Sequence, residues 1–220
     1  MNIKYLGHAC FLITSGEYAL LVDPFLDGNP AGAAKAEEVS ATHVFVTHGH
    51  DDHFGDAASI ASRCKATVYA TVETAGRFPK EVTVEVGQIG GFIRAAFGGV
   101  KFTAAAHGSA VPGGLACGFL IEVAGKKIYH AGDTGLIMDM ALLADESVDV
   151  ALLPIGDRFT MGPRDARRAV GLIKPKRVVP MHYNTWPIID QNPEGFKKDV
   201  EAETGVPVTV LPAGGSFAPW

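Results

Sequence analysis

The chain has 220 residues, of which 47% are apolar and 20% are charged. This length gives room for one domain with a substantial core, and the apolar content excludes intrinsic disorder as the main state. Nineteen basic and 24 acidic residues give a net charge of −5, which disfavours a protein that wraps nucleic acid or lies on an anionic membrane. We therefore expect one globular domain over residues 1–220.

The cysteines and the start of the chain indicate a cellular compartment. Cys10, Cys64 and Cys117 are scattered and form no C-x-x-C pair, so a disulfide framework is not expected and a reducing environment fits best. The first residues lack the basic start and long apolar run of a signal peptide. These features predict a cytoplasmic protein.

One uncharged stretch, residues 102–121, has the length of a membrane span. It contains His107, Pro112 and four glycines, and such a segment would leave backbone groups unsatisfied in lipid. We interpret it as strand, loop, strand, with no membrane association.

Short apolar runs bounded by turn residues dominate the first half of the chain. They predict strands over residues 3–6, 10–14, 19–22 and 44–47, followed by an alanine-rich helix over residues 55–63. Two glycine pairs, Gly90-Gly91 and Gly98-Gly99, match no phosphate-binding motif and are interpreted as hairpin turns.

The second half of the chain also contains short apolar runs bounded by turn residues, and two helices are predicted near its end. Strands are predicted over residues 100–106, 118–123, 127–130, 148–153, 177–181 and 206–211. An apolar stripe at helical spacing predicts a helix over residues 165–173, and Asn192 followed by Pro193 predicts a last helix that ends at Gly205. Two sets of strands with interspersed helices favour a layered α/β sandwich.

Histidines and aspartates gather where these predicted strands end. The motif H-x-H-x-D-H follows the strand over residues 44–47 directly, and single residues follow three later strands. The candidate metal ligands are His48, His50, Asp52, His53, His107, Asp133 and His182. Imidazoles and carboxylates bind zinc and related divalent metals. Seven such groups exceed the needs of one tetrahedral ion, which points to two metals sharing a carboxylate, an arrangement suited to hydrolysis.

Two further residues have a structural and a functional interpretation. Asp23 follows an apolar run, so it either caps its own turn or orients the ligand loop as a hydrogen-bond acceptor; we favour the second. His8 lies in a glycine-flanked turn between two early strands and is either a packed core residue or part of the pocket.

Four residues near the predicted ligands are weighed in the same way. Asn184 and Trp186 directly follow the last ligand and are candidate walls for a substrate, although Trp186 could equally belong to the core. His43 begins a strand and His130 ends one, and for both the structural interpretation is preferred.

The ligand series resembles that of the metallo-β-lactamase fold superfamily. Five segments are similar to the compact bacterial and archaeal metal-dependent hydrolases related to ascorbate-6-phosphate lactonases. They are Gly7-His8-Ala9-Cys10, Asp23-Pro24-Phe25, Thr47-His48-Gly49-His50, His130-Ala131-Gly132-Asp133-Thr134 and Met181-His182-Tyr183-Asn184-Thr185. The resemblance covers the whole chain and implies a four-layer αββα sandwich with the metal site at one edge between the sheets.

The resemblance also implies how the ligands are divided. It assigns one metal to His48, His50 and His107, a second metal to Asp52, His53 and His182, and a bridging role to Asp133. Histidine at both positions of the H-x-H pair favours hydrolysis over the redox chemistry of the di-iron relatives.

The resulting functional hypothesis is a binuclear metal-dependent hydrolase. A metal-bridging hydroxide attacks a carbonyl or phosphoryl centre, Asp52 orients that nucleophile or accepts its proton, and His8 or water protonates the leaving group. Zinc is the expected metal, with manganese, iron, nickel or cobalt as alternatives. The expected partner is a small-molecule substrate, an ester or lactone ahead of a phosphodiester or nucleic acid. A non-catalytic metal-binding module is the alternative of another class, and self-association stays open.

Overall fold

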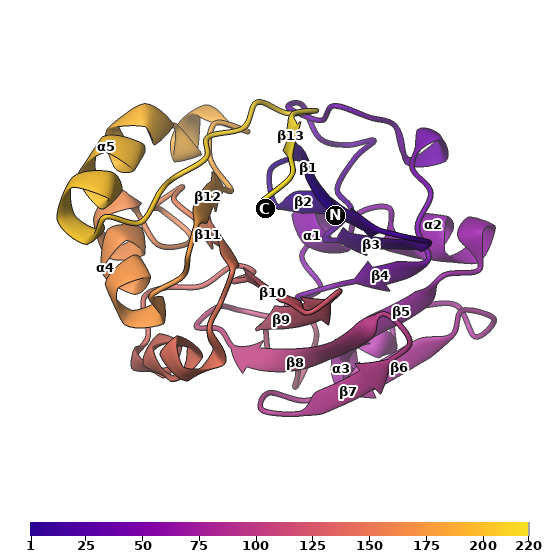
Figure 1. Ribbon diagram of the computed structural model, residues 1–220. Helices are drawn as coiled ribbons and strands as arrows, with labels where there is room; N and C mark the ends of the chain where they lie inside the picture. The colour runs from indigo at the N-terminus through magenta and orange to yellow at the C-terminus, as the bar shows by residue number, and fades with distance from the viewer. Residues whose placement is uncertain (220) are drawn as a thin grey trace.

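The computed structural model describes residues 1–219, and its centre consists of two β-sheets that face each other (Figure 1). The first sheet contains seven strands. In spatial order they are β13 (Ser216–Phe217), β1 (Asn2–Gly7), β2 (Cys10–Ser15), β3 (Tyr18–Val22), β4 (His43–Phe45), β5 (Thr67–Thr71) and β6 (Val84–Gly87).

The second sheet contains six strands. In spatial order they are β12 (Val178–Met181), β11 (Val150–Pro154), β10 (Lys126–His130), β9 (Cys117–Val123), β8 (Gly98–Ala104) and β7 (Phe92–Ala95). The predicted strand, loop, strand over residues 102–121 is confirmed, since it runs from β8 into β9. Within residues 1–219, no helix has the length and apolar character that a bilayer crossing requires.

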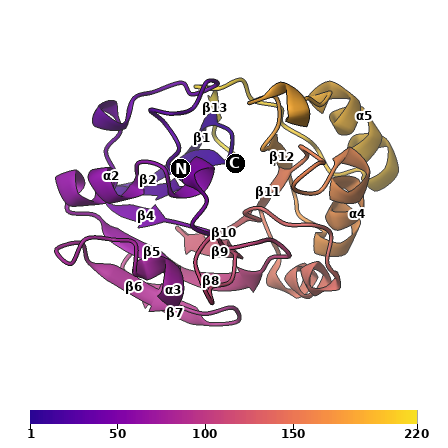
Figure 2. The same cartoon turned by 180° about the vertical axis from the view of Figure 1, so that it is seen from behind.

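Helices cover the outer faces of both sheets. The α-helices are α1 (Asp51–Phe54), α2 (Ala57–Cys64), α3 (Val72–Ala75), α4 (Pro163–Ile173) and α5 (Pro193–Thr204), and the 3-10 helices are η1 (Ala36–Glu38), η2 (Met138–Glu146) and η3 (Pro187–Ile189). Helix α2 lies outside the first sheet, whereas α4 and α5 lie outside the second, as both views show (Figures 1 and 2). The four-layer αββα sandwich is therefore confirmed.

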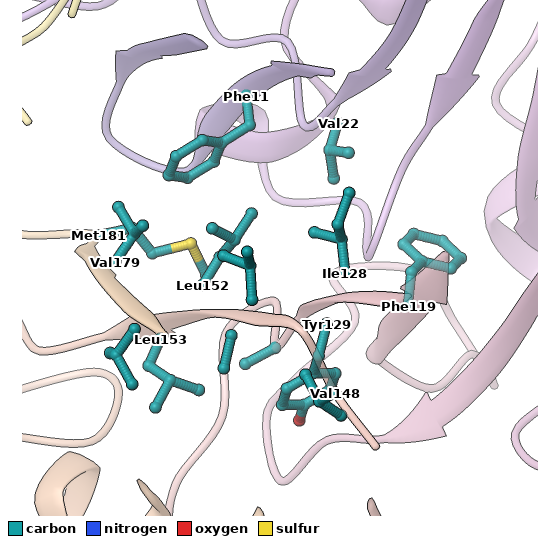
Figure 3. Packing of buried hydrophobic residues seen from close by; sticks show 14 of the residues in the cluster. Phe11, Val22, Phe119, Ile128, Tyr129, Val148, Leu152, Leu153, Val179 and Met181 are labelled. Carbon is teal, nitrogen blue, oxygen red and sulfur yellow. The ribbon is translucent and has the colours of Figure 1, made fainter. Parts of the chain in front are cut away.

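The main core lies between the sheets and follows from strand alternation. Phe11 and Val22 of the first sheet face Ile128 and Leu152 of the second, and all four are fully buried (Figure 3). Tyr129 points to the opposite face of the second sheet. Because both faces of that sheet are covered, its central strands read as continuous apolar runs instead of alternating ones.

The structure corrects parts of the strand prediction. The predicted strand over residues 206–211 is wrong: Val208 forms only an isolated bridge with Val178, because Pro207 and Pro212 have no N–H to continue a ladder. The pair Gly98-Gly99 begins β8 instead of forming the hairpin turn, since Ala95 pairs with Gly98. The buried strand β5 and the short, partly exposed strands β6 and β7 were not predicted.

Strand direction decides where the site can form. In the first sheet β1, β3 and β4 run in the same direction, because β2 pairs antiparallel with both β1 and β3, and β3 pairs parallel with β4. In the second sheet β8, β10, β11 and β12 likewise share one direction. Residues that follow these strands therefore collect at one rim of each sheet.

Candidate metal centre

The candidate ligands all follow strands that end at this rim. The first sheet supplies the H-x-H-x-D-H motif after β4, with His8 after β1 and Asp23 after β3. The second sheet supplies His107 after β8, Asp133 after β10 and His182 after β12. The parallel strand ends thus bring together residues from all along the chain.

One group of imidazoles consists of His48, His50 and His107. Each offers a ring nitrogen, and these nitrogens lie within 4.8 Å of one another. The three rings are close but not stacked, with centroids 4.8 to 5.2 Å apart. This group has the spacing and chemistry to hold one metal ion.

A second group contains Asp52, His53 and His182, with His8 inside the same 4.8 Å limit. Asp133 lies between the two groups. Its Oδ2 is 3.0 Å from His182 Nε2 and 3.6 Å from His107 Nε2, and its Oδ1 is 3.2 Å from His53 Nε2. One carboxylate therefore reaches imidazoles of both groups.

The ligand motif folds into its own short helix. His50 is the N-cap residue of α1, and its carbonyl accepts hydrogen bonds from the backbone N–H groups of His53 and Phe54. This single helical turn places Asp52 and His53 in the second group, whereas His50 belongs to the first. The predicted helix over residues 55–63 is observed as α2, which starts two residues later because the turn at Gly55 separates it from α1.

Asp23 fixes the orientation of two imidazoles. Its Oδ2 accepts hydrogen bonds from His53 Nδ1 at 2.8 Å and from Thr47 Oγ1 at 2.7 Å, and Thr47 Oγ1 in turn accepts one from His48 Nδ1 at 2.9 Å. This network assigns the ring protons of both histidines to Nδ1. Their Nε2 atoms point toward the other candidate ligands.

Several site residues hold an unusual backbone conformation. His8, Asp23 and His182 have φ values of +57°, +46° and +55°, a left-handed region that non-glycine residues seldom occupy. Gly156 lies against His182: a Cβ atom at position 156 would lie 2.3 Å from the carbonyl oxygen of His182. Backbone strain of this kind concentrates at functional sites, where surrounding contacts maintain it.

The electrostatics of the second group follow from pairing buried charges. Burial lowers the pKa of His53, but Asp133 and Asp23 outweigh that effect and raise it well above its ordinary value. Burial raises the pKa of Asp133, but His53 and His182 outweigh it and hold the pKa well below the ordinary range. Asp133 is therefore ionised at neutral pH.

The first group behaves differently because burial outweighs the influence of the nearby Asp133 carboxylate. Burial, helped by the neighbouring His53, lowers the pKa of His48 to about 3. Burial also lowers the pKa of His107. Both rings are neutral at physiological pH, which is the form that binds a metal ion.

Buried polar atoms without hydrogen-bond partners test whether a metal fits here. Within residues 1–219 such atoms include His48 Nε2, His53 Nε2, Asp133 Oδ1 and both ring nitrogens of His182. Leaving buried polar atoms unsatisfied costs about 1–3 kcal/mol each. These atoms belong to the two candidate ligand groups and to Asp133 between them, and imidazole nitrogens and carboxylate oxygens are metal ligands. The residues present therefore suit a divalent metal ion.

A pocket of about 200 Å³ opens beside these residues. Two aromatic side chains, Phe159 and Trp186, form walls of the pocket. The rest of its lining consists of five candidate ligands: His50, Asp52, His107, Asp133 and His182. Phe159, which the sequence analysis missed, is 53% exposed and sits in a tight turn after β11. The sequence feature that could have indicated Phe159 is its position in the polar turn that follows the apolar run over residues 148–153.

Asn184 does not line the pocket, in contrast to the prediction. Its side-chain oxygen accepts a hydrogen bond from the backbone N–H of Gln191 at 2.7 Å. With φ at +57°, the residue shapes the loop that carries Trp186. A short polar side chain in this conformation can hydrogen-bond to nearby backbone groups, so Asn184 stabilises the loop.

His8 contacts Asp52 from behind the pocket. It is fully buried, with Nε2 3.2 Å from Asp52 Oδ2 and Nδ1 2.8 Å from Thr185 Oγ1. Burial lowers the pKa of His8 to about 4, so the ring is neutral. Because a carboxylate only accepts, the ring proton lies on Nε2 and faces Asp52.

The expected structural roles of the two remaining histidines agree with their surroundings. His130 Nε2 donates to the carbonyl of Ala9, and its Nδ1 accepts from the backbone N–H of Gly132. His43 packs edge-on against Phe97, with ring centroids 4.9 Å apart.

A four-layer αββα sandwich with H-x-H-x-D-H and three further candidate ligands at one rim defines a metal-dependent hydrolase of the metallo-β-lactamase superfamily. The sequence profile of the β-lactamase superfamily domain matches residues 2–182. The metallo-β-lactamase fold protein YhfI from Bacillus subtilis, at 15% identity, superimposes with a TM-score of 0.77 over 99% of both chains, which shows the common fold.

Two more similar proteins narrow the family. A UPF0173 metal-dependent hydrolase from Pelotomaculum thermopropionicum is 50% identical over 229 residues, covering 99% of each chain. Igni18, a metallo hydrolase from the archaeon Ignicoccus hospitalis, is 34% identical with a TM-score of 0.89, covering 99% of this chain and 98% of that one. The chain belongs to the family of UPF0173 metal-dependent hydrolases.

Proposed function

We propose that this hydrolase uses two divalent metal ions to cleave a small-metabolite ester or lactone. His48, His50 and His107 would hold one ion, Asp52, His53 and His182 would hold the other, and Asp133 would be shared between them. The observation that carries the proposal is the position of Asp133, whose Oδ2 lies 3.6 Å from His107 Nε2 in the first group and 3.0 Å from His182 Nε2 in the second.

When bound, two such ions supply an acidified water as nucleophile and an electrophilic centre for the scissile oxygen. Asp52 reaches the pocket and is 29% exposed. Burial raises its pKa, but the hydrogen bond from His8 and the neighbouring His53 together outweigh burial, and the pKa lies below its ordinary value. Asp52 is thus an ionised carboxylate that orients the attacking water and accepts its proton.

His8 acts on Asp52 and not on the substrate. The ring is fully buried, does not line the pocket, and uses both nitrogens in hydrogen bonds to Asp52 and Thr185. We therefore assign His8 a positioning role and leave protonation of the leaving group to water.

The pocket supports a small substrate with an apolar part. Its volume of about 200 Å³ is below the roughly 300–1,000 Å³ of pockets that enclose drug-sized ligands. Phe159 and Trp186 form apolar walls beside the ligands. The net charge of −5 opposes long polyanions, so a phosphodiester or nucleic acid ranks second.

Zinc and a cytoplasmic location complete the proposal. Five histidines and two aspartates make a nitrogen-rich donor set that suits zinc, while manganese, iron, nickel and cobalt are accepted by the same ligands. The three cysteines are free, and Cys10 and Cys117 are buried, as expected in a reducing compartment.

The Asp133→Ala variant tests the binuclear assignment. We expect the metal content to fall from two ions per chain to one or none and turnover to fall by more than about 100-fold, the upper end for outer-shell substitutions. Asp199→Ala, an exposed position on α5, is the control. Two metals and full turnover in Asp133→Ala, with unchanged circular dichroism, would refute the bridging role.

A substrate panel tests the reaction class. Metal-loaded and chelator-treated protein is assayed on lactones, carboxylic esters, phosphomonoesters and phosphodiesters. Chelator-sensitive cleavage of lactones or esters is expected. Preferential cleavage of phosphodiesters would replace the proposal by its alternative, and inactivity on every class with metal bound would favour a binding module.

A further inference from the structure

We infer that Arg77 is a positioning residue that holds the H-x-H segment in its metal-binding conformation. The inference rests on the proposed function, because it takes His48, His50 and His107 as ligands of one ion. Arg77 lies outside the ligand motif, directly after α3, and does not line the pocket.

The peptide group of Gly49 connects the two ligands His48 and His50. Its N–H donates to the carbonyl oxygen of Ser109 at 2.7 Å, so it is tied to the loop that carries His107. A Cβ atom at Gly49 would lie 2.6 Å from Val111 Cγ2 and 3.0 Å from Ser109 O. A side chain at position 49 would collide with Val111 and Ser109. The His48–His50 segment is therefore packed closely against the loop that carries His107.

Arg77 holds the other side of the same residue. Its Nη1 donates to the carbonyl oxygen of Gly49, and its Nη2 lies 3.3 Å from Asp51 Oδ1. The guanidinium also lies over the ring of Phe54, 4.0 Å from the centroid. A planar fork with several donors and an aromatic contact can make all three interactions at once, whereas a lysine ammonium group cannot.

These contacts span the ligand motif from Gly49 to Phe54. The Gly49 carbonyl is flanked by two ligands, so a rotation of this peptide would move both imidazoles relative to His107. Arg77 also fixes Asp51 and Phe54, which belong to α1. Because the Gly49 carbonyl lies between two ligands of the first group, the main effect should fall on the preorganisation of the first metal site, which raises metal affinity without any contact to the ion.

A zinc titration with a competing chromophoric chelator tests the inference on the full chain after metal removal. We expect Arg77→Met to weaken zinc binding at one of two sites by about 10- to 100-fold, the range for outer-shell partners. Arg63→Met is a matched control, because Arg63 also clamps two backbone carbonyls, those of Ala36 and Val39, but far from the ligands. The Arg63→Met variant should bind zinc at both sites with wild-type affinity.

The site affected is identified in a His50→Ala background. There the remaining zinc affinity should not change further on adding Arg77→Met, since both substitutions act on the same site. If His50→Ala itself still binds two equivalents with wild-type affinity, the proposed function fails. If His50→Ala loses one equivalent but Arg77→Met keeps both affinities, only the inference about Arg77 is overturned.

Folding is checked by circular dichroism. Should Arg77→Met fail to fold, Arg77→Lys carries the test, because its single ammonium group cannot serve Gly49 and Asp51 together. A several-fold weaker affinity at one site supports the inference, and an unchanged affinity overturns it.

Discussion

At the scale of single residues, Asp23 shows how one buried carboxylate prepares a metal site. It accepts two hydrogen bonds on Oδ2 and one from the backbone N–H of Thr47 on Oδ1. Burial raises its pKa, but the neighbouring His53 outweighs burial and lowers it. The carboxylate stays charged and, directly or through Thr47, fixes a ring proton of His53 and of His48 on Nδ1, the nitrogen that faces away from the other candidate ligands.

The Asp23→Asn variant tests this role. The amide keeps the shape but cannot accept on both sides, so both imidazoles lose their fixed tautomer and metal affinity should fall by about 10- to 100-fold. Chelator competition measures it. Asp56→Asn is the control, since Asp56 accepts from the backbone N–H groups of Leu26 and Asp27 and contacts no ligand. Equal affinities in the two variants would contradict the role.

At the scale of elements, the junction between α1 and α2 links the ligand motif to the Asp23-Pro24-Phe25 turn. Gly55 ends α1 with φ at +38°, and a Cβ atom there would lie 2.5 Å from the carbonyl oxygen of Pro24. The backbone N–H of Asp56 donates to that same oxygen. A glycine is required because the two segments touch backbone to backbone.

We expect Gly55→Ala to reduce the free energy of unfolding by about 1–3 kcal/mol, the range for a strained, crowded position. Urea denaturation measures the change. Gly171→Ala is the matched control, because Gly171 lies in α4 with open space around it; alanine there should be neutral or stabilising by up to about 1 kcal/mol. A Gly55→Ala protein as stable as wild type would show that the junction relaxes freely.

At the scale of the whole molecule, burial keeps several histidines neutral. Five histidines have a pKa below the ordinary 6.5: His8, at about 4, His48, at about 3, and His43, His107 and His130. In all five the cause is burial, which penalises the charged form. Only His53 among the described histidines with a resolved shift goes the other way.

These pKa values predict how the metal-free fold responds to pH. A histidine with a lowered folded pKa stays neutral while the unfolded chain takes up its proton below about pH 6.5, so stability falls as the pH falls. Each such group contributes up to about 1.4 kcal/mol per pH unit. His53 opposes this, since its raised pKa adds stability at low pH that is lost as the pH rises through the folded value.

Because five groups oppose one, the free energy of unfolding of chelator-treated protein should decrease from pH 7 to pH 5. Urea denaturation at both pH values, in the same chelator and ionic strength, measures this. Equal or greater stability at pH 5 would mean that the pairing of His53 with Asp23 and Asp133 dominates the fold.

The candidate ligands could be picked out from the sequence because their signal is local. H-x-H-x-D-H and the residues after three later strands appear as polar positions at the ends of apolar runs, and the stripe of α4 buries Ala166, Ala169, Val170 and Ile173 as its spacing predicted. The family resemblance added the αββα order of layers. Composition and local pattern alone thus determined the residue types of the site and the class of fold.

Tertiary structure decided how these residues contact one another. The parallel ends of strands in two separate sheets place Asp133 between both ligand groups, assign His8 to Asp52, and bring Phe159 into the pocket while Asn184 stays outside. The hold of Arg77 on Gly49, 28 residues away in sequence, is of the same kind. Such contacts depend on strand direction and on packing between distant segments, which local sequence patterns do not encode.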